Sequence, residues 1–305
     1  MTLELVKADG MQKMKAIFYG VRGSLPTPGK NTVKYGGNTS CIEIVIPDSD
    51  QIFIIDAGTG IRELGNKLAA KRDKTINLFI SHTHWDHIHG FPFFVPIYMP
   101  HHKINVYGPA HDSLDLSLHD VLTRQMDYSV FPVRYGELQA EIQYTAMKRE
   151  TKKFGDVEVT ARPLNHSVLT LGYSISHKGK KVVYQSDHEP FHNLFSESID
   201  ETDSFINELN EKIVNFARGA DLLIADSTYT PEEYETHRGW GHSSWMHVLD
   251  RAIAAEVKTL AIFHHDPAHN DLFMDKMSSD IKVEAEKKGV KFKIVTAMEG
   301  MELEL

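Results

Sequence analysis

The sequence predicts an α/β protein in which helices cover buried β-sheet, and three observations support this fold class. Short apolar runs rich in β-branched residues are typical of buried strands, amphipathic patterns lie between them, and histidines or aspartates directly follow many of the runs. The 305 residues, 41% of them hydrophobic, are enough to bury a large core and exclude disordered or collagen-like classes. No repeat, charge block or Gly/Ser/Pro-rich linker divides the chain, so we expect residues 1–305 to form a single domain.

The apolar runs place the strands, and the helical periodicities place the helices. Strands are expected at residues 42–46, 52–55, 76–80, 157–160, 182–184, 222–225 and 260–263. Apolar residues recur with helical spacing over 205–216 and 245–253, and further helices are expected at 61–71 and 273–288. We expect these amphipathic helices to cover the sheet, because each has one apolar face to bury.

Composition limits the cofactors and partners. Cys41 is the one cysteine, so an intramolecular disulfide or a thiolate metal site is not expected, and a metal would bind His, Asp or Glu. The net charge of −9 disfavours long nucleic acid and anionic membranes as partners. No apolar stretch approaches the roughly 18 residues of a membrane span, and the start lacks a signal-peptide pattern. We therefore expect a soluble, cytoplasmic protein, and its 18 histidines stand out.

Polar side chains follow five of the expected strands at the point where each strand ends. In chain order they include Asp56, His82, Asp187, Asp226 and His264. In layered α/β folds, ligands bind at the carboxyl edge of the sheet, so these side chains are expected to converge on one site.

The sharpest motif is His82-x-His84-x-Asp86-His87. Residues two apart at a strand end point the same way, so His82 and His84 can present imidazoles to one ion. The chain then turns, and Asp86 and His87 can face a second ion; two ions roughly 3.5–4 Å apart form a clamp for hydrolysing phosphate and acyl bonds. A histidine-rich surface turn is the alternative, but such a cluster directly after an apolar strand is costly without a metal.

With this motif the sequence resembles the metallo-β-lactamase superfamily of binuclear metal hydrolases, over nearly the whole chain. The family pattern His-x-His-x-Asp-His stands at 82–87, and the turn Asp56-Ala57-Gly58-Thr59-Gly60 resembles the aspartate turn that supports the family's site. The resemblance implies the metallo-β-lactamase fold, a four-layer αβ/βα sandwich. It also implies the metal ligands: His82, His84 and His166 on one ion, Asp86, His87 and His264 on the other, and Asp187 bridging both.

Several of these assignments have alternatives. His166 could be a hydrogen-bonded core histidine, and Asp187 could be a helix N-cap. His265 competes with His264, but the resemblance favours His264, because it directly follows the apolar run. The other histidines fit no ligand position and are expected at the surface or in supporting contacts: His89, His101, His102, His111, His119, His177, His188, His192, His237, His247 and His269.

The ligand types also limit the metal. Imidazole and carboxylate without thiolate suit Zn²⁺ and admit Mn²⁺, Fe²⁺ or Co²⁺, so we expect two divalent ions, with zinc as the default. The flavodiiron branch of the superfamily has an acidic residue where this chain has His84, so the sequence keeps the hydrolytic pattern.

Two segments resemble the branch that contains ribonuclease Z and the cyclic-nucleotide phosphodiesterases. The first is the turn-rich stretch 20–29, continued by residues 35–41, and the second is Gly241-His242-Ser243-Ser244, with Asp226 upstream. The catalytic candidates are Asp86, Asp226 and His242. An imidazole oriented by a carboxylate makes a general acid for an alkoxide leaving group, and this is the role expected for His242 beside Asp226. The alternative is a histidine at a helix N-terminus with Ser243 as cap.

The expected reaction is hydrolysis of a small phosphodiester, with a 3′,5′-cyclic nucleotide as the substrate. Two ions would activate water, and His242 would protonate the departing ribose oxygen. The long arm with which ribonuclease Z grips transfer RNA is absent between Leu164 and Asp187, and the charge of −9 disfavours such a partner. Five aromatic residues are candidates for stacking on the base of the nucleotide, and core packing is the alternative role for them: Phe93, Phe94, Tyr98, Phe131 and Trp240.

Three other functions stay open: a ribonuclease Z-like RNA-processing nuclease, a hydrolase of carboxylic esters, thioesters or lactones, and a non-catalytic ligand sensor. The ester hydrolase would not need Asp226 and His242, and the intact ligand set argues against the sensor. The resemblance alone implies a homodimer. Segments 111–150 and 188–220 are the expected substrate-selecting or interface insertions.

Overall fold

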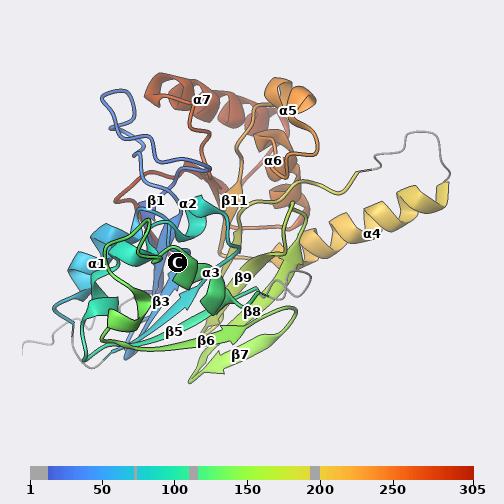
Figure 1. The fold of residues 1–305 in the computed structure, drawn as a ribbon. Helices are drawn as coiled ribbons and strands as arrows, with labels where there is room; N and C mark the ends of the chain where they lie inside the picture. The colour runs from blue at the N-terminus through green and yellow to red at the C-terminus, as the bar shows by residue number, and fades with distance from the viewer. Residues whose placement is uncertain (1–12, 72–73, 110–115, 193–199) are drawn as a thin grey trace, which may run out of the picture.

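The computed structural model describes residues 13–71, 74–109, 116–192 and 200–305, with residues 200–203 described by their backbone alone. His111 and parts of the segments 111–150 and 188–220 therefore lie outside the described residues. Figure 1 shows two β-sheets with helices around them. Among the described residues no helix is long and apolar enough to cross a membrane.

Among the described residues, each sheet has seven strands. The first sheet has the spatial order β14 (Glu302–Glu304), β1 (Lys15–Gly20), β2 (Cys41–Val45), β3 (Gln51–Ile55), β4 (Thr75–Phe79), β5 (Lys103–Gly108) and β6 (Glu141–Ala146). The second has the order β13 (Lys293–Thr296), β12 (Thr259–Phe263), β11 (Leu222–Asp226), β10 (Lys180–Gln185), β9 (Thr170–His177), β8 (Val157–Leu164) and β7 (Thr151–Phe154).

Helices flank both sheets. They are α1 (Ile61–Leu68), α2 (Trp85–Ile88), α3 (Leu118–Arg124), α4 (Asp200–Ala217), α5 (Pro231–His237), α6 (Trp245–Ala254) and α7 (Asp271–Lys287), with short 3₁₀ turns η1 (Phe91–Phe93), η2 (Val95–Tyr98) and η4 (Tyr135–Glu137). The helix α1 packs on the outer face of the first sheet, whereas α6 and α7 pack on the second.

In the described part of the chain, three hydrophobic cores separate the layers. The central core joins the two sheets, with side chains such as Phe53 and Phe79 from the first and Tyr173 and Phe263 from the second. A second core lies between the first sheet and α1, and a third lies between the second sheet and α6 with α7. This order of layers is the predicted four-layer αβ/βα sandwich, and the predicted fold class is confirmed.

The strand directions bring the strand ends together. Strands β3 to β6 run parallel in one sheet, and β10 to β13 run parallel in the other. Ligand-type side chains follow β3, β4, β8, β10 and β12, and Asp226 is the last residue of β11. The carboxyl ends of parallel strands lie at one edge of a sheet, so this topology can build one site from distant segments.

The seven strands expected from the sequence are all present, with ends shifted by a few residues. The helix expected at 61–71 ends earlier, at Leu68. The structure also contains strands that the sequence pattern does not predict: β1, β5, β6, β7, β9, β13 and β14. Strands such as β6 (Glu141–Ala146) and β7 (Thr151–Phe154) are half-exposed, so they lack the continuous apolar run on which the prediction depends.

Candidate metal centre

Three histidines and one carboxylate oxygen face one another at the edge of the two sheets. His84 Nδ1 lies 2.9 Å from His82 Nε2 and 3.1 Å from His166 Nε2. Asp187 Oδ2 lies 3.5 Å from His82 Nε2 and 3.7 Å from His166 Nε2. His82 and His84 follow β4, His166 follows β8 and Asp187 follows β10, so the group joins both sheets. We call it the first ligand group.

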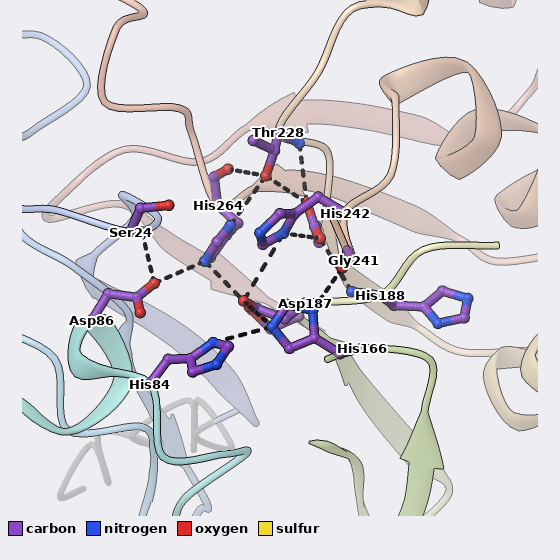
Figure 2. A network of polar contacts seen from close by, with 12 residues as sticks. Ser24, His84, Asp86, His166, Asp187, His188, Thr228, Gly241, His242 and His264 are labelled. Atoms are coloured by element: carbon purple, nitrogen blue, oxygen red, sulfur yellow. Dashed lines mark hydrogen bonds and ion pairs between the residues drawn. The ribbon is translucent and has the colours of Figure 1, made fainter. Parts of the chain in front are cut away.

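A second ligand group lies beside the first and shares Asp187. His87 Nε2 and His264 Nε2 each lie 3.1 Å from Asp86 Oδ2. The same two nitrogens lie 3.1 Å and 3.2 Å from Asp187 Oδ1. Asp187 thus turns one oxygen toward each group, as a bridging carboxylate does, and Figure 2 shows dashed lines from its carboxylate to His166 of the first group and to His264 of the second.

The two groups fit divalent metal ions. Two ligands on a tetrahedral ion with bonds of 2.0–2.1 Å are about 3.3 Å apart, and the distances within both groups scatter around this value. His87 Nε2 is buried between one oxygen of Asp86 and one of Asp187, 3.1 Å from each, but makes no aligned hydrogen bond to either. A metal ion bound here would satisfy the nitrogen and both carboxylates together.

The protonation states of the first ligand group also favour a metal. In the second group, burial is outweighed by the charges of Asp86, Asp187 and Asp56, which raise the pKa of His87. Burial lowers the pKa of His82, His84 and His166, so these imidazoles are neutral and have a free lone pair. Burial raises the pKa of Asp187, but the neighbouring histidines outweigh burial and hold it well below its usual range. Neutral imidazole and ionised carboxylate are the forms that bind divalent ions.

The Asp56 turn supports the second ligand group. Asp56 is buried and has a φ of 61°, a conformation that aspartate tolerates better than most residues. Its Oδ2 lies 2.7 Å from His87 Nδ1 and accepts hydrogen bonds from the hydroxyls of Tyr184 at 2.6 Å and Ser81 at 2.9 Å. Because Nδ1 of His87 donates to this carboxylate, Nε2 is left for the metal.

Other supports orient the remaining ligands. His166 Nδ1 lies 2.9 Å from the carbonyl oxygen of Gly241, which leaves Nε2 for the first ligand group. His264 Nδ1 lies 3.1 Å from the hydroxyl of Thr228, which donates to Asp226 at 2.7 Å. The backbone N–H of Ser24 donates to Asp86 Oδ2 at 2.7 Å. These contacts fix the direction from which each ligand approaches.

Asp226 and His242 form a hydrogen-bonded pair beside both groups. His242 Nδ1 lies 2.9 Å from Asp226 Oδ2 and 3.9 Å from Asp187 Oδ2. Its ring centroid lies 5.2 Å from that of His166 and 5.1 Å from that of His264. Burial lowers the pKa of His242, but the charge and hydrogen bond of Asp226 outweigh burial and raise the pKa to about 9. The pair can therefore hold a proton close to the place where two metals would bind.

Several sequence alternatives are decided by the geometry. His265 Nε2 lies 2.8 Å from the carbonyl oxygen of Ala297, away from both ligand groups. The N-cap of α6 is Ser244, not Ser243, so His242 lies in the loop before the helix. Within the described part of the chain, no helix begins at Asp187. His188 is buried, and its Nδ1 accepts from the backbone of Asn165, so it supports the site and does not join it.

Sequence reasoning missed several supporting groups, among them the hydroxyl of Thr228, the backbone of Ser24 and the carboxylate of Glu189. Thr228 had a local signal, because an aspartate commonly accepts from the backbone two residues on, as Asp226 does from the Thr228 N–H at 3.0 Å. Ser24 and Glu189 act through contacts with distant segments, which no local pattern reveals.

The layered fold and the shared His/Asp groups define the class of α/β metal-dependent hydrolases. Residues 52–265 match the family described as "Beta-lactamase superfamily domain", so the chain belongs to the metallo-β-lactamase superfamily. Ribonuclease Z of Prochlorococcus marinus (strain MIT 9515) is 23% identical, over 90% of this chain and 95% of that protein. Ribonuclease Z of Picrophilus torridus is also 23% identical, over 85% of this chain and 87% of that protein.

Solved structures share the fold at low sequence identity. The metallo-β-lactamase fold protein YhfI from Bacillus subtilis has a TM-score of 0.67 at 18% identity, over 96% of this chain and all of that one. Human tRNase Z, short form, has a TM-score of 0.62 at 18% identity, over 95% of this chain and 98% of that one. A diphosphatase from the PhnP family has a TM-score of 0.64 at 16% identity, over 96% of this chain and 98% of that one.

Proposed function

We propose that this chain hydrolyses a small phosphodiester, with a 3′,5′-cyclic nucleotide as the substrate class and two divalent ions, zinc by default, as cofactors. The observation that carries the proposal is the Asp226–His242 pair, hydrogen-bonded at 2.9 Å and placed beside Asp187, which the two ligand groups share. An alkoxide is a poor leaving group, so its departure benefits from a positioned acid.

The ligands in this proposal are those of the two groups. They are His82, His84 and His166 in the first, Asp86, His87 and His264 in the second, and Asp187 in both. Ions bound there would supply positive charge for the phosphate oxygens and lower the pKa of a water molecule between them. The protein contributes a prearranged cage, so little reorganisation is needed when charge develops on the phosphate.

His242 is the proposed general acid, and Asp226 is its positioning residue. Because Nδ1 of His242 donates to Asp226, its Nε2 is the nitrogen that can deliver a proton to the departing oxygen. Asp226 is itself fixed by the backbone N–H groups of His188 at 3.1 Å and Thr228 at 3.0 Å. The imidazole is thereby held in one orientation relative to the ligand groups.

An apolar cavity supports a substrate with an aromatic group. A cavity of about 680 Å³ is lined by Thr83, Trp85 and Val168. These residues are close in the chain to His84 and His166, so the cavity lies near the first ligand group, although no ligand residue lines it. This volume is within the range of about 300–1,000 Å³ for small-molecule sites. Aromatic walls beside a phosphate site suit a nucleobase.

The candidate stacking residues fall into three groups. Phe93 and Phe131 line the cavity, with ring centroids 5.4 Å apart. Trp240 is 62% exposed and lies two residues before His242, so its ring is accessible to a substrate near that residue. Phe94 is buried in the core and Tyr98 is fixed by a hydrogen bond to the Pro92 carbonyl, so packing accounts for both.

The relatives named ribonuclease Z favour a second candidate function, RNA processing. The segment between Leu164 and Asp187 speaks against it, because β9 (Thr170–His177) and β10 (Lys180–Gln185) form a hairpin in the sheet with a short turn. The net charge of −9 also opposes the counterion release on which RNA affinity depends.

The test compares four substrates on the metal-loaded protein: a 3′,5′-cyclic nucleotide, bis(p-nitrophenyl) phosphate, p-nitrophenyl acetate and a cephalosporin. Turnover of the phosphodiester, and of a 3′,5′-cyclic nucleotide, is the expected result. Turnover of the ester or the cephalosporin alone would replace the proposal with the carboxylic hydrolase, and turnover of none would favour the ligand sensor.

The proposed acid is tested by His242→Ala. We expect kcat on a cyclic nucleotide to fall by roughly 10²–10⁴-fold, the usual range for general acid catalysis. The loss should be much smaller on bis(p-nitrophenyl) phosphate, because p-nitrophenolate leaves without a proton. His177→Ala removes an imidazole that pairs with Asp156 at the end of β9 remote from His166, and serves as control. Equal losses on both substrates would contradict the role of His242.

A further inference from the structure

Glu189 is a buried carboxylate, 2% exposed, that lies two residues after Asp187. Its Oε1 accepts hydrogen bonds from the Tyr234 hydroxyl and the Gly239 N–H, both at 2.8 Å. Its Oε2 accepts from the Gly241 N–H at 2.8 Å and from the Gly239 N–H at 3.1 Å. A buried charge is retained only where its hydrogen bonds are satisfied, and here the loop between α5 and α6 satisfies it.

The loop bound by Glu189 contacts the first ligand group. Gly239 and Gly241 have φ values of 84° and 87°, so the backbone turns sharply here. The carbonyl of Gly241 lies 2.9 Å from His166 Nδ1, and a Cβ on Gly241 would lie 2.2 Å from the same atom. His242 follows directly in the chain. The position of this loop therefore fixes both the orientation of the His166 ring and the position of the His242 backbone.

The backbone of Glu189 is fixed to the segment that carries His166. The N–H of Glu189 donates to the carbonyl of Asn165 at 3.0 Å, and the Asn165 side-chain amide donates to the carbonyl of Glu189 at 2.9 Å. Glu189 is thus bonded to the ends of β8 and β10 through its backbone and to the 238–242 loop through its side chain.

We propose that Glu189 is a positioning residue that holds the 238–242 loop against His166, and so fixes the metal-binding nitrogen of His166 and the imidazole of His242 relative to Asp187. The part that concerns His242 rests on the proposed function, whereas the part that concerns His166 does not. The second ligand group has separate supports, since His87 is held by Asp56.

The test uses Glu189→Gln, which keeps the shape but replaces one acceptor oxygen with an NH₂ that faces backbone N–H donors. We expect the affinity of one of the two metal sites to fall about 10–100-fold, the usual effect of removing a support of a ligand histidine, and the other to change less than about threefold. Stepwise Zn²⁺ titration against a chromophoric chelator measures both affinities without any substrate.

Two controls separate positioning from loss of charge or stability. Glu232→Gln removes an exposed carboxylate of the same helix, and Tyr234→Phe removes one donor to Glu189 but leaves the loop contacts. Both should keep both metal affinities. Gly241→Ala leaves Glu189 intact but displaces the loop from His166, so it should lower the affinity of the same single metal site. This variant tests the effect of the loop position on metal binding if Glu189→Gln does not fold.

A second experiment measures activity. It compares the loss in kcat that Glu189→Gln causes on a cyclic nucleotide with the loss on bis(p-nitrophenyl) phosphate, both at saturating metal. A larger loss on the cyclic nucleotide is expected, because a displaced His242 matters most for a leaving group that needs a proton. Equal weakening of both metal sites, or no weakening of either, would overturn the proposal. If the protein hydrolyses no phosphodiester, the metal titration still decides the role of Glu189.

Discussion

Substitution of Asp56 by asparagine is the perturbation whose effect the structure defines best. The buried carboxylate accepts four hydrogen bonds: three at Oδ2, from His87, Tyr184 and Ser81, and one at Oδ1, from the Ser81 N–H at 2.7 Å. Asparagine keeps the volume and tolerates the φ of 61°. Its NH₂ group must replace one oxygen, and the less costly choice is Oδ1, where it meets a single donor.

The cost follows from these contacts. The Ser81 N–H loses its acceptor, which costs about 1–3 kcal/mol, and each of the three remaining bonds weakens by about 1 kcal/mol when its acceptor becomes neutral. Relief from burying a charge offsets part of this sum, so we expect the free energy of unfolding to fall by about 3 kcal/mol. Tyr184→Phe removes one of the four bonds and should cost about 1.5–3 kcal/mol.

Urea unfolding of the metal-free proteins, followed by circular dichroism, measures both values. The asparagine variant should also bind metal about 10–100-fold more weakly at one site, because His87 loses the carboxylate that orients it. A stability loss below about 1 kcal/mol for Asp56→Asn, or unchanged metal affinity, would refute the reasoning that this carboxylate holds the site together.

Further predictions concern the ligands and the substrate. Asp187→Ala should lower the occupancy of both ions in elemental analysis, because its two oxygens face different groups; loss of one ion alone would contradict a bridging role. His264→Ala should lower the metal content whereas His265→Ala should not, since His265 bonds to the Ala297 carbonyl; the reverse result would exchange their roles. The protein should not cleave precursor tRNA efficiently at physiological salt, because the net charge is −9, and efficient 3′-end cleavage would support the RNA-processing function instead.

The sequence by itself determined the fold class and the residues that meet at the site. Buried parallel strands need continuous apolar runs, so the pattern of apolar residues is sufficient to locate β3, β4, β10, β11 and β12. The polar residues after these runs are recognisable for a related reason, because parallel strands deliver their carboxyl ends to one edge. Half-exposed strands such as β6 and β7 lack this signal, and the apolar pattern does not predict them.

Only the tertiary structure decided how those residues face one another. The alternation of side chains is a rule for extended strands, and it ends at His264, whose φ is 62°. Which of His264 and His265 faces the ligand groups therefore depends on packing against Thr228 and Ala297. Asp187 turns one oxygen toward each ligand group, and Glu189 contacts Gly241. Both arrangements join segments that are distant in the chain, and local sequence patterns carry no information about such contacts.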